Sequence, residues 1–316
     1  MMPANCLSIL RCGPLVTIQD GGRHGYRSFG LSPSGPVDRD SQRIANRLVG
    51  NREADACLEF ALVGGVFKVE RDCLFAVTGG RCAIDIDGQP RTCWESHVLR
   101  RGETLTVGAL EGAVWGYLAI SGGIVTEPVL GSRSTHLRTG VGGLGGRVLA
   151  AGDLLPLGHG KDMAPKRLGS PYLRSQAPIR IIAGPQDDYF DASTWSSLLS
   201  RPFSPTPARD RMAMVLEGPQ ICAFKGHDIV SDATLAGSIQ VPGSGKPIVL
   251  TADGQTTGGY PKIATIASAD LLRLAQMPNG QKFRFRRISA DAAEDLLLDA
   301  QDRLADVLDT IERDPG

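Results

Sequence analysis

Residues 237–261 read GSIQVPGSGKPIVLTADGQTTGGYP. Two short apolar runs, 238–241 and 247–251, flank a Pro-Gly-Ser-Gly turn. β-type runs that are joined by a short glycine-containing turn predict a β-hairpin. The second run is followed by a polar, glycine-rich loop that ends at Pro261. We therefore expect a hairpin that leads into a ligand-binding loop.

This loop combines hydrogen-bonding side chains with glycines. Glycine allows backbone N–H groups to approach a ligand closely, which favours a binding site. Gly, Asp and Thr are also ordinary turn residues, so a solvated turn is the alternative interpretation. The candidate residues, together with a glutamine from the first run of the hairpin, are Gln240, Asp253, Gln255, Thr256, Thr257, Gly258, Gly259 and Tyr260.

The composition indicates a mostly β protein of two domains. A chain of 316 residues is long enough for two domains, each with its own core. The 39 glycines and 20 prolines imply many tight turns. Lys plus Arg and Asp plus Glu number 34 each, so no net charge attracts nucleic acid or an anionic membrane. Neither partner is expected, and no run is long and apolar enough to span a membrane.

The seven cysteines indicate a reducing compartment. Their number is odd, and no C-x-x-C pair occurs among them. Buried reduced thiols are the simplest interpretation, and they are typical of a cytoplasmic protein.

The spacing of runs and turns predicts the domain organisation. Between residues 58 and 110, short β-type runs alternate with glycine turns, a pattern typical of a sandwich or barrel. We expect an N-terminal β domain over 1–160 and a C-terminal β domain over 179–316. The segment 161–178 is rich in Gly, Pro, Lys and Arg and is predicted to be a linker.

Helices are expected at two prominent places in this β framework. Ile44, Ala45 and Leu48 recur at helical spacing after Asp38, which occupies the N-cap position. Beyond Ser289, leucines recur at helical spacing with acidic residues between them. This pattern predicts a terminal amphipathic helix of about 24 residues that docks on the body of the protein.

Two polar loops of the N-terminal half carry further candidate residues. Asp20 and Arg23 flank a glycine pair and are expected to lie on a surface turn, where they could form an ion pair. Ser34 lies beside a Gly-Pro in the same loop. The second loop offers a guanidinium and two hydroxyls to an anion. Its residues are Arg133, Ser134 and Thr135.

Several familiar motifs are incomplete. Residues 140–145 fit G-x-G-x-x-G, but no βαβ unit surrounds them, which favours a flexible loop over a dinucleotide site. A phosphate-binding loop at 243–246 would require glycine in place of Gln240 and Ser or Thr in place of Pro247. The five histidines show no metal-ligand spacing, and no G-x-S-x-G elbow occurs. We expect neither a metal site nor an activated serine.

Several stretches, in order along the chain, resemble one known family. The matching sequence motifs include Q-D-x-G-R, S-G-P-x-D, A-N-R-L-V-G-N, WGYLAISGG, VLGSRST, GPQDDYF, D-R-M and QTTGGYPKIA. The family contains the C subunit of 5-oxoprolinase, the sporulation-kinase regulator KipA and the carboxyltransferase half of urea carboxylase, also called allophanate hydrolase subunit 2. This chain departs from the family at Trp115, where arginine is usual, and at Ala213-Met214, where Gly-Tyr or Gly-Phe is usual.

The resemblance implies two cyclophilin-like β-barrel domains and a function that requires partner subunits. In the 5-oxoprolinase case, a complex phosphorylates the small-molecule substrate 5-oxoproline with ATP and hydrolyses the opened ring to glutamate. The partners implied are a B-type subunit and an A-type, lactam-hydrolysing subunit. ATP is used by the complex, and the resemblance leaves open whether this chain contacts it.

Such chemistry requires donors for a developing oxyanion and a carboxylate that positions or deprotonates water. Arg23, Arg133 and the backbone at Gly258-Gly259 are candidates for the first role. Asp20 and Asp253 are candidates for the second. With Arg23 they form the predicted catalytic set, and the predicted substrate contacts are Ser34, Arg133, Ser134, Thr135, Gln240, Thr256, Thr257, Gly258, Gly259 and Tyr260.

Two other functions from the same family stay open. A KipA-type protein would sequester a kinase inhibitor and perform no chemistry. A half-site for biotin-dependent carboxyl transfer would need biotin on another polypeptide, because this chain has no Met-Lys-Met attachment sequence.

Overall fold

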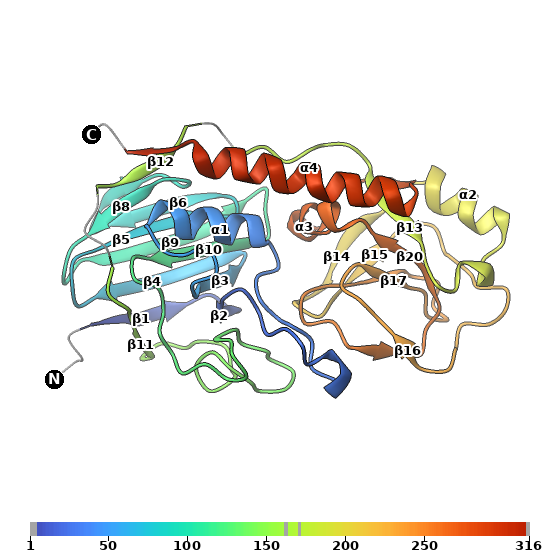
Figure 1. Ribbon diagram of the computed structural model, residues 1–316, viewed down its shortest axis with the longest axis horizontal. Helices are drawn as coiled ribbons and strands as arrows, with labels where there is room; N and C mark the ends of the chain where they lie inside the picture. The colour runs from blue at the N-terminus through green and yellow to red at the C-terminus, as the bar shows by residue number, and fades with distance from the viewer. Residues whose placement is uncertain (1–4, 161–163, 170–171, 314–316) are drawn as a thin grey trace. The chain divides into compact units, whose positions relative to one another are not determined.

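The chain folds into two compact units, which we describe separately. The structure is a computed structural model that describes residues 5–160, 164–169 and 172–313 (Figure 1). Unit 1 comprises Met1–Arg23, Ser34–Leu173 and Leu304–Gly316. Unit 2 comprises His24–Pro33 and Arg174–Arg303. Both units are mostly β, as predicted, and each combines segments that lie far apart in the sequence.

A six-stranded sheet forms one part of unit 1. Its order is β11-β1-β4-β9-β6-β7. In chain order, β1, β4, β6, β7, β9 and β11 span Cys6–Cys12, Val63–Val69, Arg81–Ile86, Gln89–Arg91, Thr104–Glu111 and Leu154–Pro156. All neighbours in this sheet pair antiparallel. Short antiparallel strands with tight turns are what the regular spacing predicts.

A five-stranded sheet, in the order β2-β3-β10-β5-β8, completes the framework of unit 1. In chain order, β2, β3, β5, β8 and β10 span Val16–Gln19, Cys57–Ala61, Cys73–Thr78, Ser96–Leu99 and Trp115–Ile120. Side chains from both sheets, including Leu7, Phe67, Phe75 and Leu118, belong to one buried cluster. The two sheets therefore share a single hydrophobic core.

Helix α1 (Arg39–Leu48) packs on β5 and β10 through the apolar face that the sequence predicts. Ile44, Ala45 and Leu48 are fully buried. Asp38 is the N-cap, as predicted, and its carboxylate accepts a hydrogen bond of 3.3 Å from the backbone N–H of Ser41.

Part of the segment expected to be a linker is a strand. β12 (Lys166–Leu168) pairs antiparallel with β22 (Ile311–Arg313). The remainder of this segment is only partly within the described residues. The pairing attaches the C-terminal end of the chain to unit 1, a contact that a local composition signal cannot reveal.

A seven-stranded sheet, in the order β14-β15-β18-β17-β20-β13-β21, is the framework of unit 2. In chain order, β13, β14, β15, β17, β18, β20 and β21 span Ile179–Ala183, Ser204–Arg209, Ala213–Glu217, Ser238–Gln240, Ile248–Leu250, Lys262–Ile266 and Phe285–Arg287. The predicted hairpin is confirmed, because β17 and β18 pair antiparallel with Ile239 opposite Val249. β20 pairs on the other side of β17, with Gln240 opposite Lys262.

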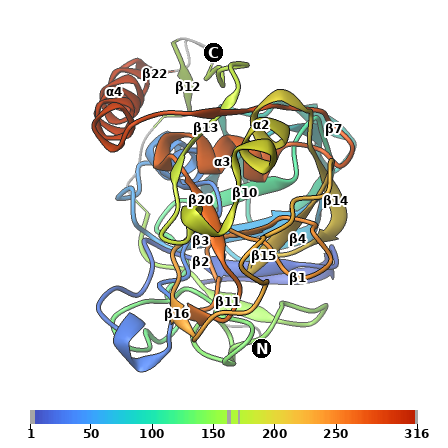
Figure 2. The same cartoon turned by 90° about the vertical axis from the view of Figure 1, so that its right-hand side faces the viewer.

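Smaller elements complete unit 2. β16 (Asp232–Ala233) and β19 (Thr257–Gly258) form a two-stranded sheet within the glycine-rich region. Helix α2 (Ala192–Ser200) contacts β21, and α3 (Ser268–Gln276) contacts β13. Figure 2 shows α3 next to β13. Two 3-10 helices, η1 (Arg27–Phe29) and η2 (Asp187–Tyr189), occupy loops.

The predicted terminal helix is present as α4 (Ala290–Asp309), which is 20 residues long. Its residues up to Arg303 group with unit 2, and those from Leu304 group with unit 1. Leu304 and Leu308 are buried, so the helix docks by its apolar face as expected. In the described part of the chain, no helix combines the length and apolar character needed to cross a bilayer.

A buried ion group attaches α3 to β13. The carboxylate of Asp270 is fully buried and accepts hydrogen bonds of 2.6 and 2.7 Å from Arg180 and of 2.5 Å from Arg273. Burial alone would raise the pKa of Asp270, but the hydrogen bonds and charges of these two arginines outweigh burial and lower it.

We predict that Asp270→Ala lowers the free energy of unfolding by about 3–5 kcal/mol, because both arginines lose a buried partner. Urea unfolding of the purified chain measures this loss. Asp188→Ala is the control, since Asp188 pairs with Lys225 in an exposed position and exposed pairs contribute about 0–1 kcal/mol. Equal effects of the two substitutions would contradict the assignment.

Candidate functional site

In unit 1, the carboxylate of Asp20 is the centre of a buried hydrogen-bond cluster. Its oxygens accept bonds from the hydroxyls of Ser132 (2.5 Å) and Ser134 (2.7 Å). They also accept from the backbone N–H groups of Arg133 (2.6 Å) and Gly22 (3.0 Å). Burial alone would raise the pKa of Asp20, but these four bonds outweigh burial and lower it. Three of the donors bind Oδ1 and one binds Oδ2, and three of the four come from residues 132–134, so Asp20 anchors this loop.

The expectation that Asp20 and Arg23 lie on a surface turn is wrong. Asp20 is 9% exposed and Arg23 is 1% exposed. Arg23 donates to the backbone carbonyls of Val129 (2.9 Å), Ser132 (3.3 Å) and Ser134 (2.9 Å). Both side chains therefore attach the end of β2 to a loop more than a hundred residues further along the chain.

The glycines of the 140–147 loop have a packing role. Gly142 has φ +75°, and a Cβ atom there would lie 2.1 Å from the carbonyl oxygen of Ser134 and 2.6 Å from the guanidinium of Arg23. At Gly143, a Cβ atom would lie 2.0 Å from the hydroxyl of Thr135. Only glycine fits at such positions. These contacts explain the G-x-G-x-x-G pattern without a nucleotide.

Ser34 has two unusual properties for a serine. Its φ of 58° is in the left-handed region, where residues other than glycine are strained. Its hydroxyl oxygen is buried without a hydrogen-bond partner among the described residues. The next residue, Gly35, packs on the backbone of Asp20 and Gly22, since an ideal Cβ there would lie 3.3 Å from both. A strained residue with an unmet polar group beside an ordered cluster is typical of a ligand contact.

Glu59 and Tyr117 hold the segment that follows Ser34, and neither residue was predicted from the sequence to have a role. The Glu59 carboxylate accepts from the backbone N–H of Val37 (2.8 Å) and from the hydroxyl of Tyr117 (2.7 Å). That hydroxyl in turn accepts from the backbone N–H of Asp38 (2.7 Å). Burial, followed by the charges of Glu59 and Asp38, raises the pKa of Tyr117 well above its ordinary value. The tyrosine of WGYLAISGG was the available signal.

Arg133 is the other predicted anion contact in unit 1. Its Nε donates to the carbonyl of Thr126 at 2.7 Å, and the side chain is half-buried. Within the described residues its guanidinium forms no ion pair. Thr135, by contrast, donates its hydroxyl to the carbonyl of Ile18 at 3.1 Å and is buried. The guanidinium of Arg133 can therefore bind an anion, whereas the hydroxyl of Thr135 stabilises the loop.

In unit 2, Asp253 belongs to a buried ion pair. Its two oxygens each accept a hydrogen bond of 2.9 Å from Arg211, and the side chains are 4% and 2% exposed. Arg211 is the arginine of the D-R-M wording, and the Ala213-Met214 departure follows it. Met214 is buried in the core of unit 2, so this departure changes packing. Asp253 therefore fixes the start of the glycine-rich loop.

The backbone of the glycine-rich loop is fixed, while its hydroxyls are not. Thr234 donates its backbone N–H to the carbonyl of Thr256, and Thr257 pairs with Ala233. Within the described residues, the hydroxyls of Thr256, Thr257 and Tyr260 make no hydrogen bond, and Tyr260 is 39% exposed. An ordered backbone that presents free hydroxyls suits ligand binding at low entropic cost.

Buried donors lie beside this loop. The Nε2 group of Gln240 is buried and lacks a partner, although its Oε1 accepts from Gln255 at 3.4 Å. Lys262 is buried, and its ammonium lies 2.8 Å from Asp232. Gln240 was predicted from the sequence as a candidate residue, but Lys262 was not, because its only signal is its position after the Tyr260-Pro261 pair.

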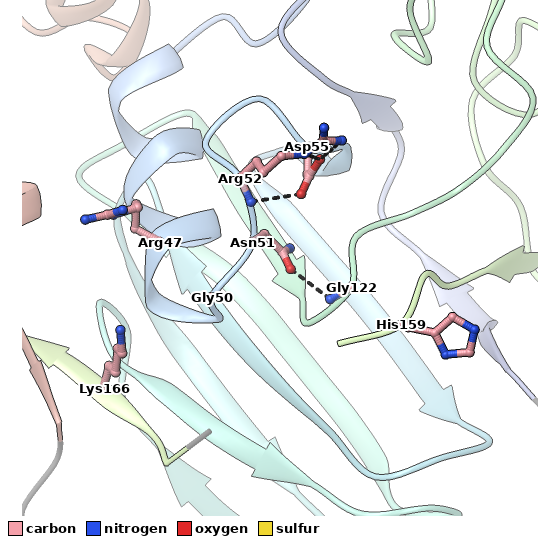
Figure 3. A pocket seen from close by; sticks show the side chains of 8 residues that line it. All are labelled: Arg47, Gly50, Asn51, Arg52, Asp55, Gly122, His159 and Lys166. Carbon is pink, nitrogen blue, oxygen red and sulfur yellow. Dashed lines mark hydrogen bonds and ion pairs between the residues drawn. The ribbon is translucent and has the colours of Figure 1, made fainter. Parts of the chain in front are cut away.

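Unit 1 also has a pocket of about 450 Å³ (Figure 3). Hydrogen bonds from Gly122 to Asn51 (2.8 Å) and from the backbone of Arg52 to Asp55 (2.9 Å) shape its wall, as Figure 3 shows. Three basic side chains of its lining form no ion pair within the described residues. These are Arg47, His159 and Lys166. The pocket could accept an anion, but it contains none of the predicted site residues.

A mostly β chain with these polar loops matches the family model for the carboxyltransferase domain, subdomain A and B, over residues 29–287. The chain belongs to this family. Among its relatives, the C subunit of 5-oxoprolinase from Escherichia coli is 39% identical over 287 residues, which cover 91% of this chain and 93% of the relative. The corresponding 5-oxoprolinase protein of Haemophilus influenzae is 34% identical, and the match covers 92% of this chain and 94% of the relative.

Solved structures agree with this fold. The crystal structure of TTHA0988 matches with a TM-score of 0.81 and 36% identity over 89% of this chain. The K. lactis urea amidolyase matches with a TM-score of 0.88 and 27% identity over 96% of this chain. This chain spans 56% of the TTHA0988 chain and 20% of the urea amidolyase chain. Both of those polypeptides therefore contain further sequence.

We predict that Ser34→Ala leaves the thermal midpoint unchanged or slightly raised, because an unmet buried hydroxyl costs about 1–3 kcal/mol. Thr78→Val is the control: its hydroxyl is also buried but donates to the carbonyl of Ser41 at 2.7 Å, so its loss should lower the midpoint. A fall for Ser34→Ala as large as for Thr78→Val would show that Ser34 serves the fold.

The lowered pKa of Asp20 predicts a pH-dependent contribution to stability. A carboxylate whose pKa is lower in the folded state stabilises above its unfolded value, about 3.9, and loses this contribution as the pH falls through the folded value. Asp20→Asn should therefore lower the free energy of unfolding of unit 1 near neutral pH. The difference in this free energy between the variant and the parent should become smaller below about pH 4. Urea unfolding across this range measures the difference, and a difference independent of pH would refute the prediction.

Proposed function

We propose that this chain is the C subunit of an ATP-dependent 5-oxoprolinase complex that converts 5-oxoproline to glutamate. The supporting observation is the match to the 5-oxoprolinase protein of Escherichia coli, 39% identical over 91% of this chain and 93% of the relative. The match extends over most of both chains, which a shared fold alone would not require.

The reaction determines what this chain must provide. Phosphorylated 5-oxoproline carries a carboxylate, a phosphate and an acyl carbon that water attacks, so acceptor oxygens dominate the ligand. Within unit 1, Arg133 and the hydroxyl of Ser34 are donors suited to such oxygens. Within unit 2, the N–H groups at Gly258-Gly259 are donors of the same kind. The free hydroxyls of the glycine-rich loop extend this set.

Asp20 and Asp253 take positioning roles in this proposal. Asp20 accepts four hydrogen bonds, and the two oxygens of Asp253 each accept one from Arg211 in a buried pair. The lowered pKa of Asp20 makes it a weak base, because its charged form is stabilised. We assign the activation of water to a group of a partner subunit.

The partners in this proposal are a B-type subunit and an A-type, lactam-hydrolysing subunit. The TTHA0988 chain contains a counterpart of this chain over 56% of its length, which is consistent with a function that needs further polypeptide. ATP is assigned to the complex, and the hairpin turn at 243–246 gives this chain no phosphate-binding loop. All seven cysteines are free thiols, which suits the cytoplasm.

A carboxyl-transfer half-site is the second candidate. It is favoured by the fold match to K. lactis urea amidolyase, with a TM-score of 0.88 over 96% of this chain. In that case biotin would be carried by another polypeptide, and urea-type substrates would replace 5-oxoproline. A KipA-type regulatory role has no comparable observation in its favour.

We predict that the purified chain alone does not turn over 5-oxoproline, and that co-expression with B-type and A-type subunits gives a complex with ATP-dependent glutamate production. Glutamate release with and without ATP measures this, and size exclusion reports the assembly. Equal turnover by the lone chain, or no turnover by an assembled complex, would refute the proposal. Carboxylation of urea by a biotin-carrying partner would instead favour the second candidate.

A further inference from the structure

Two neighbouring groups in unit 2 have N–H donors that the protein does not use. Lys262 is 2% exposed in its side chain, and its ammonium has three N–H donors but only one hydrogen-bond acceptor within the described residues, Asp232 at 2.8 Å. The Nε2 group of Gln240 has two N–H donors and no acceptor, and Gln240 is 2% exposed. Buried donors without acceptors are costly and rare, so the pair requires an explanation.

The two groups belong to neighbouring strands of the sheet. Gln240 on β17 and Lys262 on β20 are opposite each other in the antiparallel pair, at the register shift that follows the pairing of Ile239 with Ala264. Gly258 also lies close to both groups. A Cβ atom at Gly258 would lie 2.3 Å from Nε2 of Gln240. Gly258 pairs with Asp232, the acceptor of Lys262.

The two members of the ion pair differ in burial. Asp232 is 45% exposed, whereas Lys262 is 2% exposed. Water therefore screens the carboxylate of Asp232 much more than the ammonium, whose field persists in the low-dielectric interior. A hydrogen bond of 3.1 Å from Gln186 also fixes Asp232 in place. The hydrogen bond from Lys262 is the largest cause that lowers the pKa of Asp232 to about 2, so Asp232 stays charged at neutral pH.

The geometry of the neighbours keeps the amide of Gln240 in this orientation. Gln255 donates to its Oε1 at 3.4 Å, which leaves Nε2 as the end that lacks a partner. Gln186 accepts from the backbone N–H of Lys262 at 3.1 Å and so fixes the start of β20. The donors are therefore held in place before any ligand arrives.

We infer that Lys262 and Gln240 form a carboxylate-binding subsite beneath the glycine-rich loop. A carboxylate offers several acceptor sites and one negative charge, which complement the unused donors and the buried ammonium. The proposal rests on the proposed function in naming 5-oxoproline as the natural ligand, because its carboxylate is unchanged by the reaction. Lys262 and Gln240 then bind and orient the substrate without taking part in proton transfer.

The test compares a carboxylate ligand with a neutral one. The full chain and the assembled complex are titrated calorimetrically with 5-oxoproline, with acetate and with 2-pyrrolidinone, the lactam that lacks the carboxylate. Lys262→Met removes the charge, Lys262→Arg keeps it, and Gln240→Glu replaces donors with acceptors at nearly constant size. Lys246→Met is the matched control, because Lys246 also lies 2.8 Å from a carboxylate, that of Glu217, but in an exposed position.

We predict that Lys262→Met and Gln240→Glu weaken binding of 5-oxoproline about ten- to a hundredfold, the range for a lost hydrogen bond to a charged group. Binding of 2-pyrrolidinone should not change, Lys262→Arg should retain part of the affinity, and Lys246→Met should match the parent. In an active complex, the same variants should raise KM more than they lower kcat. If Lys262 only stabilises the fold, Lys262→Met should lower the thermal midpoint without changing the preference for 5-oxoproline over 2-pyrrolidinone.

Each outcome distinguishes the subsite from the proposed function. If the parent binds carboxylates in a Lys262-dependent way but the complex does not hydrolyse 5-oxoproline, the subsite stands and the assigned reaction is wrong. If the complex is active and Lys262→Met and Gln240→Glu bind 5-oxoproline like the parent, the donors contact only buried water and the subsite is refuted. Failure of the parent to prefer carboxylates also refutes it. Should Lys262→Met not fold, Gln240→Glu and Lys262→Arg decide the question.

Discussion

A charged side chain that is buried without partners costs several kcal/mol, and this cost determines how the loops of this protein are attached to its strands. Asp20 collects four hydrogen bonds, two of them from hydroxyls of a loop far along the chain. Asp270 forms ion pairs with two arginines, and Asp253 forms a bidentate ion pair with one. In each case the acid joins segments that hydrophobic packing alone would leave loosely connected.

The same constraint separates what the sequence could predict from what it could not. The hairpin around 242–245, the N-cap at Asp38 and the terminal helix depend on residues within a few positions of one another, and all three are present. Asp20 and Ser132 are 112 residues apart, so no local pattern links them. The interpretation of a surface turn failed for this reason: the turn residues are typical, but a distant loop buries them.

The resemblance to a family contributes a different kind of information. It identifies the stretches that matter, but it does not say whether a residue binds ligand or holds a loop. Thr135 lies in the family motif VLGSRST, and Asp253 pairs with the arginine of the D-R-M motif, but the contacts of both residues are internal. The departure at Trp115 concerns a buried strand position opposite Ala61, so the change affects packing between strands. Only the hydrogen-bond partners of each side chain separate these roles.

The positions without partners are therefore the informative ones. The buried carboxylates of the two loop clusters, Asp20 and Asp253, have hydrogen-bond partners. Buried polar atoms without partners elsewhere are therefore not explained by poor packing of the fold. Ser34 in unit 1 and Gln240 in unit 2 are such cases, because each has a buried polar atom without a partner within the described residues. In the same part of the chain, Lys262 uses only one of its three N–H donors, and all three residues are able to donate hydrogen bonds. A surplus of donors calls for a ligand rich in acceptors. Oxoacids and acyl phosphates meet this requirement, whereas an apolar ligand or a metal cation would leave the donors unpaired.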